Sequence, residues 1–305
     1  MNLLTMTRFL LLLLSFTALG AFPSHAALKV ATLHPLIADL VRQVGGDHVQ
    51  VVEIMKPGGD VHHFEPTARD IAEMRGSKII FASGKGLESY LDKLRDSLGA
   101  GVQLFEVGRN IPSIKLDASQ EIFVCCEHHA HGHIDPHWWH STDNMRRAAR
   151  DIGEVLAEAD PANEDAYEDN ADAVRDRIKD IDRWAKKEIS KISRSDRKLV
   201  TAHAAFGYFC KEFGFKSLPV LGLARGDDSS PQHLAQTIQF IRDNKIRAVF
   251  PEDQANPKVL AEIVRSTGVQ LGQPLIADGT SKDAHTFETM LAHNVRAIVA
   301  ALASE

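Results

Sequence analysis

Short runs of apolar and β-branched residues alternate with longer amphipathic stretches from Leu28 onward. The short runs predict strands, and the stretches with apolar residues every three or four positions predict helices. Because this alternation is typical of parallel sheets covered by helices, residues 27–142 are interpreted as an α/β lobe. Its expected strands are residues 29–34, 49–55, 78–82 and 102–107, and its expected helices are residues 36–44, 67–75 and 87–98.

A different composition begins at Asp143. Through residue 195 the chain is charged, rich in alanine and poor in glycine, which predicts two helices. The second, at about residues 163–191, would be about 40 Å long at about 1.5 Å of rise per residue. We expect this helix to be a stiff connection that limits relative motion of the parts it joins.

Strands and helices alternate again from Lys198 to the end of the chain. Residues 196–305 are therefore interpreted as a second α/β lobe. The whole chain is predicted to be an α/β protein in which two lobes with parallel sheets are joined by a long rigid helix within residues 143–195. The expected strands of the second lobe are residues 198–201, 218–223, 248–251 and 270–277, and its helices are 205–213, 231–244, 257–267 and 285–303.

The first residues are typical of a secretory signal peptide. Arg8 is the only charge before the apolar run 9–22, and small residues follow it in Pro23-Ser24-His25-Ala26. We expect residues 1–26 to be removed, because the apolar run is too short to cross a bilayer and Ser24-x-Ala26 suits a signal peptidase. No cysteine stands at the cleavage point, so the expected mature chain is a soluble periplasmic protein without a lipid anchor there.

The net charge limits the kinds of partner, and the cysteine content bears on disulfide formation. The chain has 35 Lys and Arg against 41 Asp and Glu, a net charge of −6, which argues against nucleic acid as a partner. Cys125, Cys126 and Cys210 are an odd number for an oxidising compartment, which is compatible with one disulfide and one free thiol but does not choose the pair. Cys210 also fits a buried apolar position in a helical pattern.

Metal-competent side chains follow predicted strands or loops at four places. Ligands of α/β sheets bind beyond the carboxyl ends of strands, so these places belong together. Each alone has an ordinary interpretation: a single histidine after a strand is more often a solvated loop residue, and an aspartate before glycine is typical of a turn. The side chains are the adjacent His62 and His63, then His137, His203 and Asp278.

Three imidazoles and one carboxylate suit zinc, which takes nitrogen and oxygen ligands in a tetrahedron. Manganese favours more oxygen ligands. Four protein ligands leave no position for an activated water, so this set favours holding one ion over catalysis. We expect one Zn(II) in the cleft between the lobes.

Four motifs occur in order along the chain: Pro57-Gly58 through His62-x-Phe64-Glu65-Pro66, Asp135-Pro136-His137-x-Trp139, Thr201-Ala202-His203-x-Ala205-Phe206, and Ala277-Asp278. They resemble the zinc and manganese substrate-binding proteins of ABC importers, in particular the zinc-binding, ZnuA-like branch. The resemblance covers essentially all of the mature chain. It implies that His62 rather than His63 binds the metal, together with His137, His203 and Asp278.

The resemblance also bears on the metal. Manganese-type members usually have glutamate at the position of His203, so this histidine favours zinc. Two departures are His140, where an apolar residue is common, and Phe64, which replaces the more usual tyrosine. Glu252, after a predicted strand, and His63 are candidates for side chains that hold the ligands in place.

Residues 125–133 form a short tract rich in histidine and cysteine. Such tracts bind zinc loosely, so this one is interpreted either as a weaker, accessory metal site or as a solvated polar loop. Relatives of the zinc type often carry a histidine-rich loop in this region. The candidate residues are His128, His129, His131 and His133.

The predicted function is capture of Zn(II) in the periplasm and delivery to the membrane permease of an ABC importer. The protein is expected to act as a monomer and not as an enzyme, and a separate zinc chaperone is a candidate donor. The alternatives are a manganese or iron carrier of the same family, or a zinc hydrolase using Asp278 or Glu252 as general base. The chain has neither a His-Glu-x-x-His motif nor a nucleophile elbow, which disfavours the hydrolase.

Overall fold

The computed structural model describes residues 26–99, 101–115, 134–219, 231–252 and 257–303. Residues 1–25 of the predicted signal peptide lie outside this range, as do Cys125, Cys126 and the histidine-rich tract. Within the described chain, no helix has both the length and the apolar character needed to cross a membrane.

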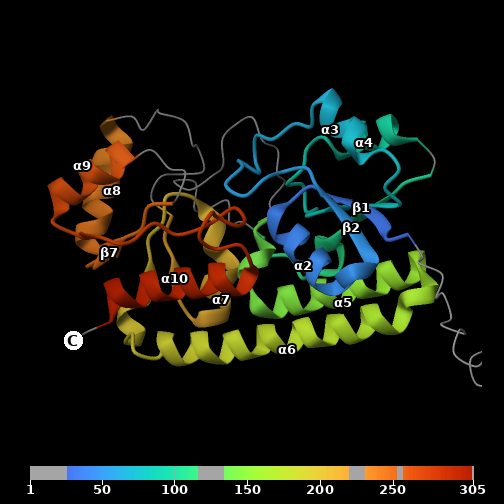
Figure 1. Cartoon of the computed structure of the whole chain (residues 1–305). Helices are drawn as coiled ribbons and strands as arrows, with labels where there is room; N and C mark the ends of the chain where they lie inside the picture. The colour runs from blue at the N-terminus through green and yellow to red at the C-terminus, as the bar shows by residue number, and fades with distance from the viewer. Residues whose placement is uncertain (1–25, 100, 116–133, 220–230, 253–256, 304–305) are drawn as a thin grey trace, which may run out of the picture.

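A four-stranded parallel sheet forms the first lobe (Figure 1). Its order is β2 (Val49–Glu53), β1 (Leu28–Thr32), β3 (Ile79–Ala82) and β4 (Gln103–Glu106). Each pair is parallel, as the expected alternation of strands and helices requires. The sheet edge at the carboxyl ends of these strands leads into the loops that carry the first two metal-competent histidines.

The two faces of this sheet bury different sets of side chains because successive residues of a strand point to opposite sides. Val30 joins the larger core, which includes residues of α2 (Pro35–Gly45) and α5 (Thr142–Ala159). The next residue, Ala31, joins a smaller core with residues of α3 (Ala68–Met74) and α4 (Leu91–Leu98). Helices therefore cover both faces, which is the arrangement that buries a parallel sheet.

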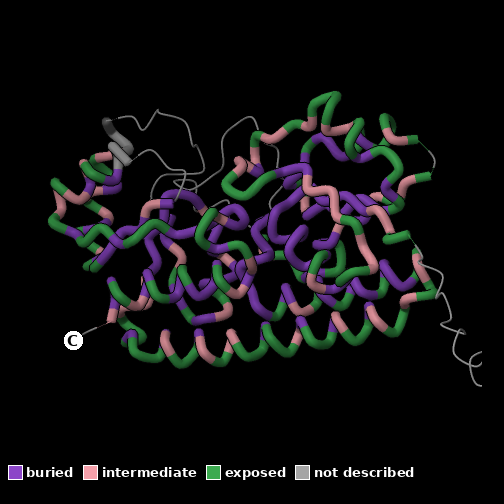
Figure 2. The backbone as a smooth tube through the Cα atoms, viewed as in Figure 1, coloured by how far each residue is buried: buried purple, intermediate pink, exposed green. Residues whose placement is uncertain are grey.

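One long helix, α6 (Glu164–Ile189), runs along the base of the molecule beneath both lobes (Figure 1). Its 26 residues span roughly 39 Å at about 1.5 Å per residue, close to the predicted length. One side is buried and the opposite side is exposed (Figure 2). The buried residues recur at helical spacing: Tyr167, Ala171, Val174, Ile178, Ala185 and Ile189.

The second lobe contains two short parallel strand pairs, β5 (Lys198–Leu199) with β6 (Lys216–Ser217), and β7 (Ala248–Val249) with β8 (Gln270–Leu271). Single bridges, Thr201 with Phe250 and Glu252 with Leu275, continue the parallel direction toward the site. Its helices are α7 (Gly207–Phe213), α8 (Pro231–Asp243), α9 (Pro257–Thr267) and α10 (Phe287–Leu302).

The strands of this lobe are shorter than predicted. The expected strand 270–277 is regular only at Gln270–Leu271, and the Gly272 N–H still donates to the Val249 carbonyl at 2.9 Å. Gly272 packs closely on the Phe250 ring, where a Cβ would lie 2.4 Å from it. Pro274 then lacks the N–H that a central strand donates. The expected strand 218–223 is replaced by Lys216–Ser217, and residues 220–223 lie outside the described chain.

The two lobes share one hydrophobic core. A single cluster of buried residues extends from Val30 in β1 through Ile178 in α6 to Ile298 in α10. A buried hydrogen bond of 2.9 Å also joins the lobes, from the Phe287 N–H to the Asp39 carboxylate in α2. The expected α/β class, parallel sheets and long helix are thus confirmed, whereas the exact boundaries at residues 142 and 195 stay a prediction.

Candidate metal centre

The loop after β2 carries the adjacent histidines. The Asp60 carboxylate accepts hydrogen bonds from the backbone N–H groups of His62 and His63, at 3.0 and 3.3 Å, and so fixes the turn. The Gly58 N–H donates to the Thr280 carbonyl at 3.0 Å, which ties this loop to the segment after Asp278. His63 is half-exposed and its Nδ1 lies 2.9 Å from Asp60, so it is His62 that turns into the protein.

His137 is buried just before α5 and is held by Asp135. The Asp135 Oδ1 accepts the His137 backbone N–H at 2.9 Å and lies 2.8 Å from its Nδ1. Burial raises the pKa of Asp135 to about 7. A carboxyl oxygen at Nδ1 favours the tautomer with its proton there, which leaves a lone pair on Nε2 for a metal.

His203 follows β5 and is held in the same way by Glu252. The Glu252 carboxylate accepts the His203 backbone N–H at 2.9 Å, and its other oxygen makes a short contact with the His203 Nδ1. Glu252 lies at the end of the chain segment that begins with β7. Two buried histidines thus meet carboxylates at Nδ1 and turn Nε2 toward one point.

Asp278 reaches the same point from the end of the β8 segment. Asn294 on α10 makes two hydrogen bonds of 2.9 Å to the backbone of Ile276, which fixes this segment as a neighbouring strand would. The Ala277 carbonyl accepts from the Trp139 indole at 2.9 Å and lies 2.7 Å from the His140 Nε2. Asp278 is consequently held by groups from both lobes.

The structure brings four predicted residues into one cluster: His62, His137, His203 and Asp278, with one ligand atom of each within 4.8 Å of all the others. The His137 Nε2 lies 3.1 Å from that of His62 and 3.3 Å from that of His203. The Asp278 Oδ1 lies 3.5 Å from the Nε2 atoms of His62 and His203 and 3.8 Å from that of His137.

These separations match a metal polyhedron. A regular tetrahedron with bonds of about 2.0–2.2 Å has edges of about 3.3–3.6 Å, and the measured edges of 3.1–3.8 Å bracket that range. Neutral imidazole nitrogens and a carboxylate oxygen are also the donor types that zinc accepts. The donor set therefore fits a single divalent ion held by four protein atoms.

The surroundings keep nearby imidazoles neutral. Burial, and after it the neighbouring His137, lowers the pKa values of His34 and His140 to about 3. Neither ring adds positive charge beside a cation. Three buried carboxyl groups, those of Asp135, Glu252 and Asp278, lie around the same point and favour a cation there.

Sequence reasoning missed one side chain of this centre. Asp135 was noted only as part of a motif, although its spacing of two residues from His137 is what lets one oxygen accept the backbone N–H and face Nδ1. Glu252 does contact a predicted ligand, His203, as expected of a side chain that holds a ligand in place.

His63 contacts Asp60 instead of the cluster, and His128, His129, His131 and His133 lie outside the described residues. Cys210 is buried and forms no disulfide within the part of the chain that the structure describes, and burial raises its pKa to about 12.

Comparisons with known proteins identify the family to which the chain is similar. The ZnuA family model, described as "Zinc-uptake complex component A periplasmic", matches residues 30–301. The iron-binding protein YfeA of Yersinia pestis is 31% identical over 261 residues, 85% of this chain and 81% of that protein. The manganese-binding lipoprotein MntA of Bacillus subtilis is 30% identical over 285 residues, 90% of each.

Solved structures of metal-binding proteins have a similar fold. The periplasmic zinc-binding protein TroA of Treponema pallidum superposes with a TM-score of 0.79 at 25% identity, covering 92% of this chain and all of that one. A manganese-bound mutant of the periplasmic metal-binding protein from Candidatus Liberibacter asiaticus also has a TM-score of 0.79 at 25% identity, covering 90% and 99%. The names of these relatives include zinc, manganese and iron.

Proposed function

This chain belongs to the ZnuA family of metal-binding, ABC-transporter substrate-binding proteins, and on that premise we propose that it captures one Zn(II) ion in the periplasm and delivers it to a membrane permease for import. It is a transport protein and not an enzyme. Its binding step needs only the four side chains His62, His137, His203 and Asp278 as ligands. With all four corners supplied by protein, no position is left for a reactive water.

The observation that supports zinc is the donor set, three imidazole nitrogens and one carboxylate oxygen at tetrahedral separations. Zinc takes this geometry readily, whereas manganese and Fe(II) favour more ligands and more oxygen. Asp135 and Glu252 hold two of the imidazoles with Nε2 directed at the ion, so little reorganisation accompanies binding.

A manganese or iron cargo is the second candidate, because relatives at 30% and 31% identity are named for these metals. Affinity alone does not separate the candidates, since sites of this kind bind zinc more tightly than manganese or Fe(II) whatever their role. The decisive measurement is transport. We expect a strain lacking this protein to lose uptake of radioactive zinc at nanomolar supply and to keep manganese uptake.

The same experiment tests the site. Restoring the strain with the His203→Ala variant should leave zinc uptake absent, whereas His63→Ala should restore it, because His63 lies outside the cluster. Loss of manganese or iron uptake with zinc uptake intact would assign the second candidate. Equal restoration by both variants would place the transported ion elsewhere.

Export and assembly complete the proposal. We expect the mature chain to begin at Ala27, to be a monomer and to bind the permease while loaded. N-terminal sequencing of the periplasmic protein and light scattering of the purified chain check the first two points.

The tract 125–133 is proposed as a weaker site that collects zinc. A count of one bound metal ion per chain rather than two at low zinc concentration would limit the tract to that role.

A further inference from the structure

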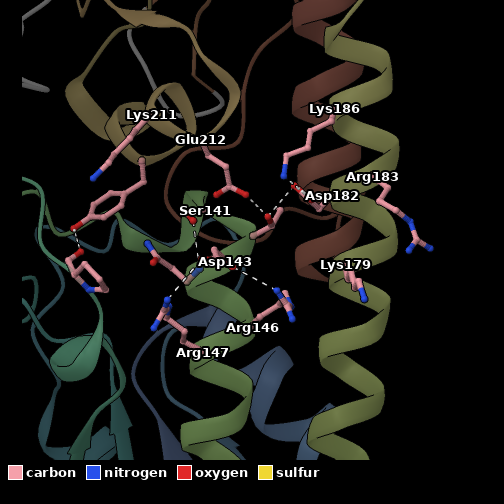
Figure 3. Close-up of a pocket in the computed structure, with 14 residues that line it drawn as sticks. Ser141, Asp143, Arg146, Arg147, Lys179, Asp182, Arg183, Lys186, Lys211 and Glu212 are labelled. Carbon is pink, nitrogen blue, oxygen red and sulfur yellow. Dashed lines mark hydrogen bonds and ion pairs between the residues drawn. The ribbon is translucent and has the colours of Figure 1, made fainter.

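A cavity of about 670 Å³ opens where α5, α6 and α7 meet, and none of the four clustered metal-competent residues lines it. Its walls come from the first two turns of α5, the second half of α6 and the residues Tyr208, Lys211 and Glu212 of α7 (Figure 3). The volume falls within the range of about 300–1,000 Å³ that small-molecule sites occupy. Charged and polar side chains make up most of the lining.

Positive charge predominates in this cavity. Among the described residues, six basic and three acidic side chains line it, and one of the basic ones, Arg183, extends away from the others (Figure 3) and pairs with Asp180 at 2.6 Å. Five basic side chains remain against three carboxylates, although the chain as a whole has a net charge of −6. The five are Arg146, Arg147, Lys179, Lys186 and Lys211.

The carboxylates of the cavity are already engaged by the protein. Asp143 lies between Arg146 at 3.4 Å and Arg147 at 3.7 Å (Figure 3). Asp182 pairs with Lys186 at 2.7 Å and accepts a hydrogen bond from Thr142 at 3.1 Å. The Thr142 hydroxyl also contacts Glu212, so all three acids have partners within the walls.

Two lysines account for the excess of positive charge in the cavity. Lys179 projects from α6 and Lys211 from α7, and within the described chain neither makes a hydrogen bond or an ion pair. Asp143 has two arginine partners, so each guanidinium keeps further N–H donors. The first turn of α5 adds the positive end of an 18-residue helix, in which the Ser141 hydroxyl caps the Asn144 N–H and Asp143 is the acidic residue.

We propose that this cavity binds a small multivalent anion that carries phosphate or carboxylate groups. Its charges would face the guanidinium groups of Arg146 and Arg147, which suit planar carboxylates and phosphate oxygens, while Lys179 and Lys211 on opposite sides of the cavity add to the positive potential (Figure 3). A concave site with surplus positive charge from two helices and an α5 N-terminus selects such ions over neutral molecules. This site is separate from the metal centre.

The test is calorimetric titration of the metal-free, full mature protein with inorganic pyrophosphate and, in parallel, with tricarballylate. We expect at least one of them to bind with one-to-one stoichiometry. Lys211→Glu and Lys179→Glu should each weaken binding about tenfold or more. Binding of pyrophosphate alone assigns a phosphate ligand, binding of tricarballylate alone assigns a carboxylate ligand, and binding of both assigns the shared chemistry.

The matched control is Lys187→Glu, which makes the same charge change at an exposed position of α6 outside the cavity. Its affinity for the probe should stay within about twofold of the wild-type value. Zinc affinity should be unchanged in all three variants, which also verifies their fold. No binding of either probe up to about 10 mM, or equal weakening by Lys187→Glu, overturns the proposal.

Discussion

The His140 Nε2 lies 2.7 Å from the carbonyl oxygen of Ala277, across the junction between the lobes. His140 follows the ligand candidate His137 by three residues, and Ala277 immediately precedes Asp278. Both members of the pair are buried. Because a carbonyl only accepts, the ring donates from Nε2, and its pKa of about 3 keeps it neutral in that role. This one hydrogen bond therefore joins the segment that carries His137 to the segment that carries Asp278, two ligand candidates that are far apart in sequence.

Replacing this histidine should loosen Asp278. We expect His140→Phe to weaken zinc binding about tenfold, the lower end of what lost support of metal ligands costs. The Trp139 indole still donates to the same carbonyl in the variant, which limits the effect. Zinc affinity is measured by competition with a chromophoric chelator.

The control is His293→Phe, which removes a similar contact of 2.8 Å to the Pro274 carbonyl at an exposed position. That variant should bind zinc with nearly wild-type affinity. If both variants lose affinity equally, the effect comes from general loosening of the second lobe and not from the His140 contact.

The carboxyl groups that hold the imidazoles give a second prediction. Asp135→Asn and Glu252→Gln keep the size of each side chain but remove the charge at Nδ1 of His137 and His203. Each should lower zinc affinity by about 10–100-fold, because the imidazole loses its anionic acceptor. Chelator competition at pH 7.5 measures the change, and Glu154→Gln, at an exposed position of α5, should have no effect.

Asp39 makes stability depend on pH. Burial raises its pKa to about 6, although the Phe287 N–H and Gln43 donate to it. The folded protein therefore holds this proton more tightly than the unfolded chain, and the associated stability, full below about pH 4, is lost as pH rises through about 6. Two pKa units correspond to about 2–3 kcal/mol.

Asp39→Asn should remove this dependence. Urea denaturation of metal-free protein between pH 4 and 7 is expected to show a smaller fall in unfolding free energy for the variant than for the wild type. Asp47→Asn, at an exposed position after α2, should follow the wild-type curve. Parallel curves for wild type and Asp39→Asn would mean that Asp39 titrates alike in both states.

The long helix sets a limit on motion. Since α6 packs against α2 of the first lobe, against its neighbour α5 in the helical segment and against α10 of the second lobe, closing the lobes would require bending it or separating its buried face. We expect metal-free and zinc-bound protein to have radii of gyration that agree within about 1 Å. Small-angle X-ray scattering of the mature chain measures this, and a larger compaction on zinc addition would contradict a rigid connection.

Periodic features of the sequence were sufficient for much of the fold. The apolar spacing in residues 163–191 predicts a helix that the structure places at Glu164–Ile189, because helical propensity and one buried face depend on local positions. The strands of the first lobe were also predicted closely, since β1 and β3 are apolar runs buried on both faces. Strand order was not predictable, because it depends on which segments distant in the sequence pair with one another.

The four ligand candidates were recognisable in the sequence as metal-competent groups at strand ends, but the choice of His62 over His63 rested on resemblance. The structure shows the physical basis: Asp60 turns His63 outward and leaves His62 in the cluster. The sequence by itself determined the donor types, the alternation of strands and helices, and the long α6. Only the tertiary structure decided which donors meet and what holds them, because the contacts of Glu252 with His203 and of His140 with Ala277 join segments 49 and 137 residues apart.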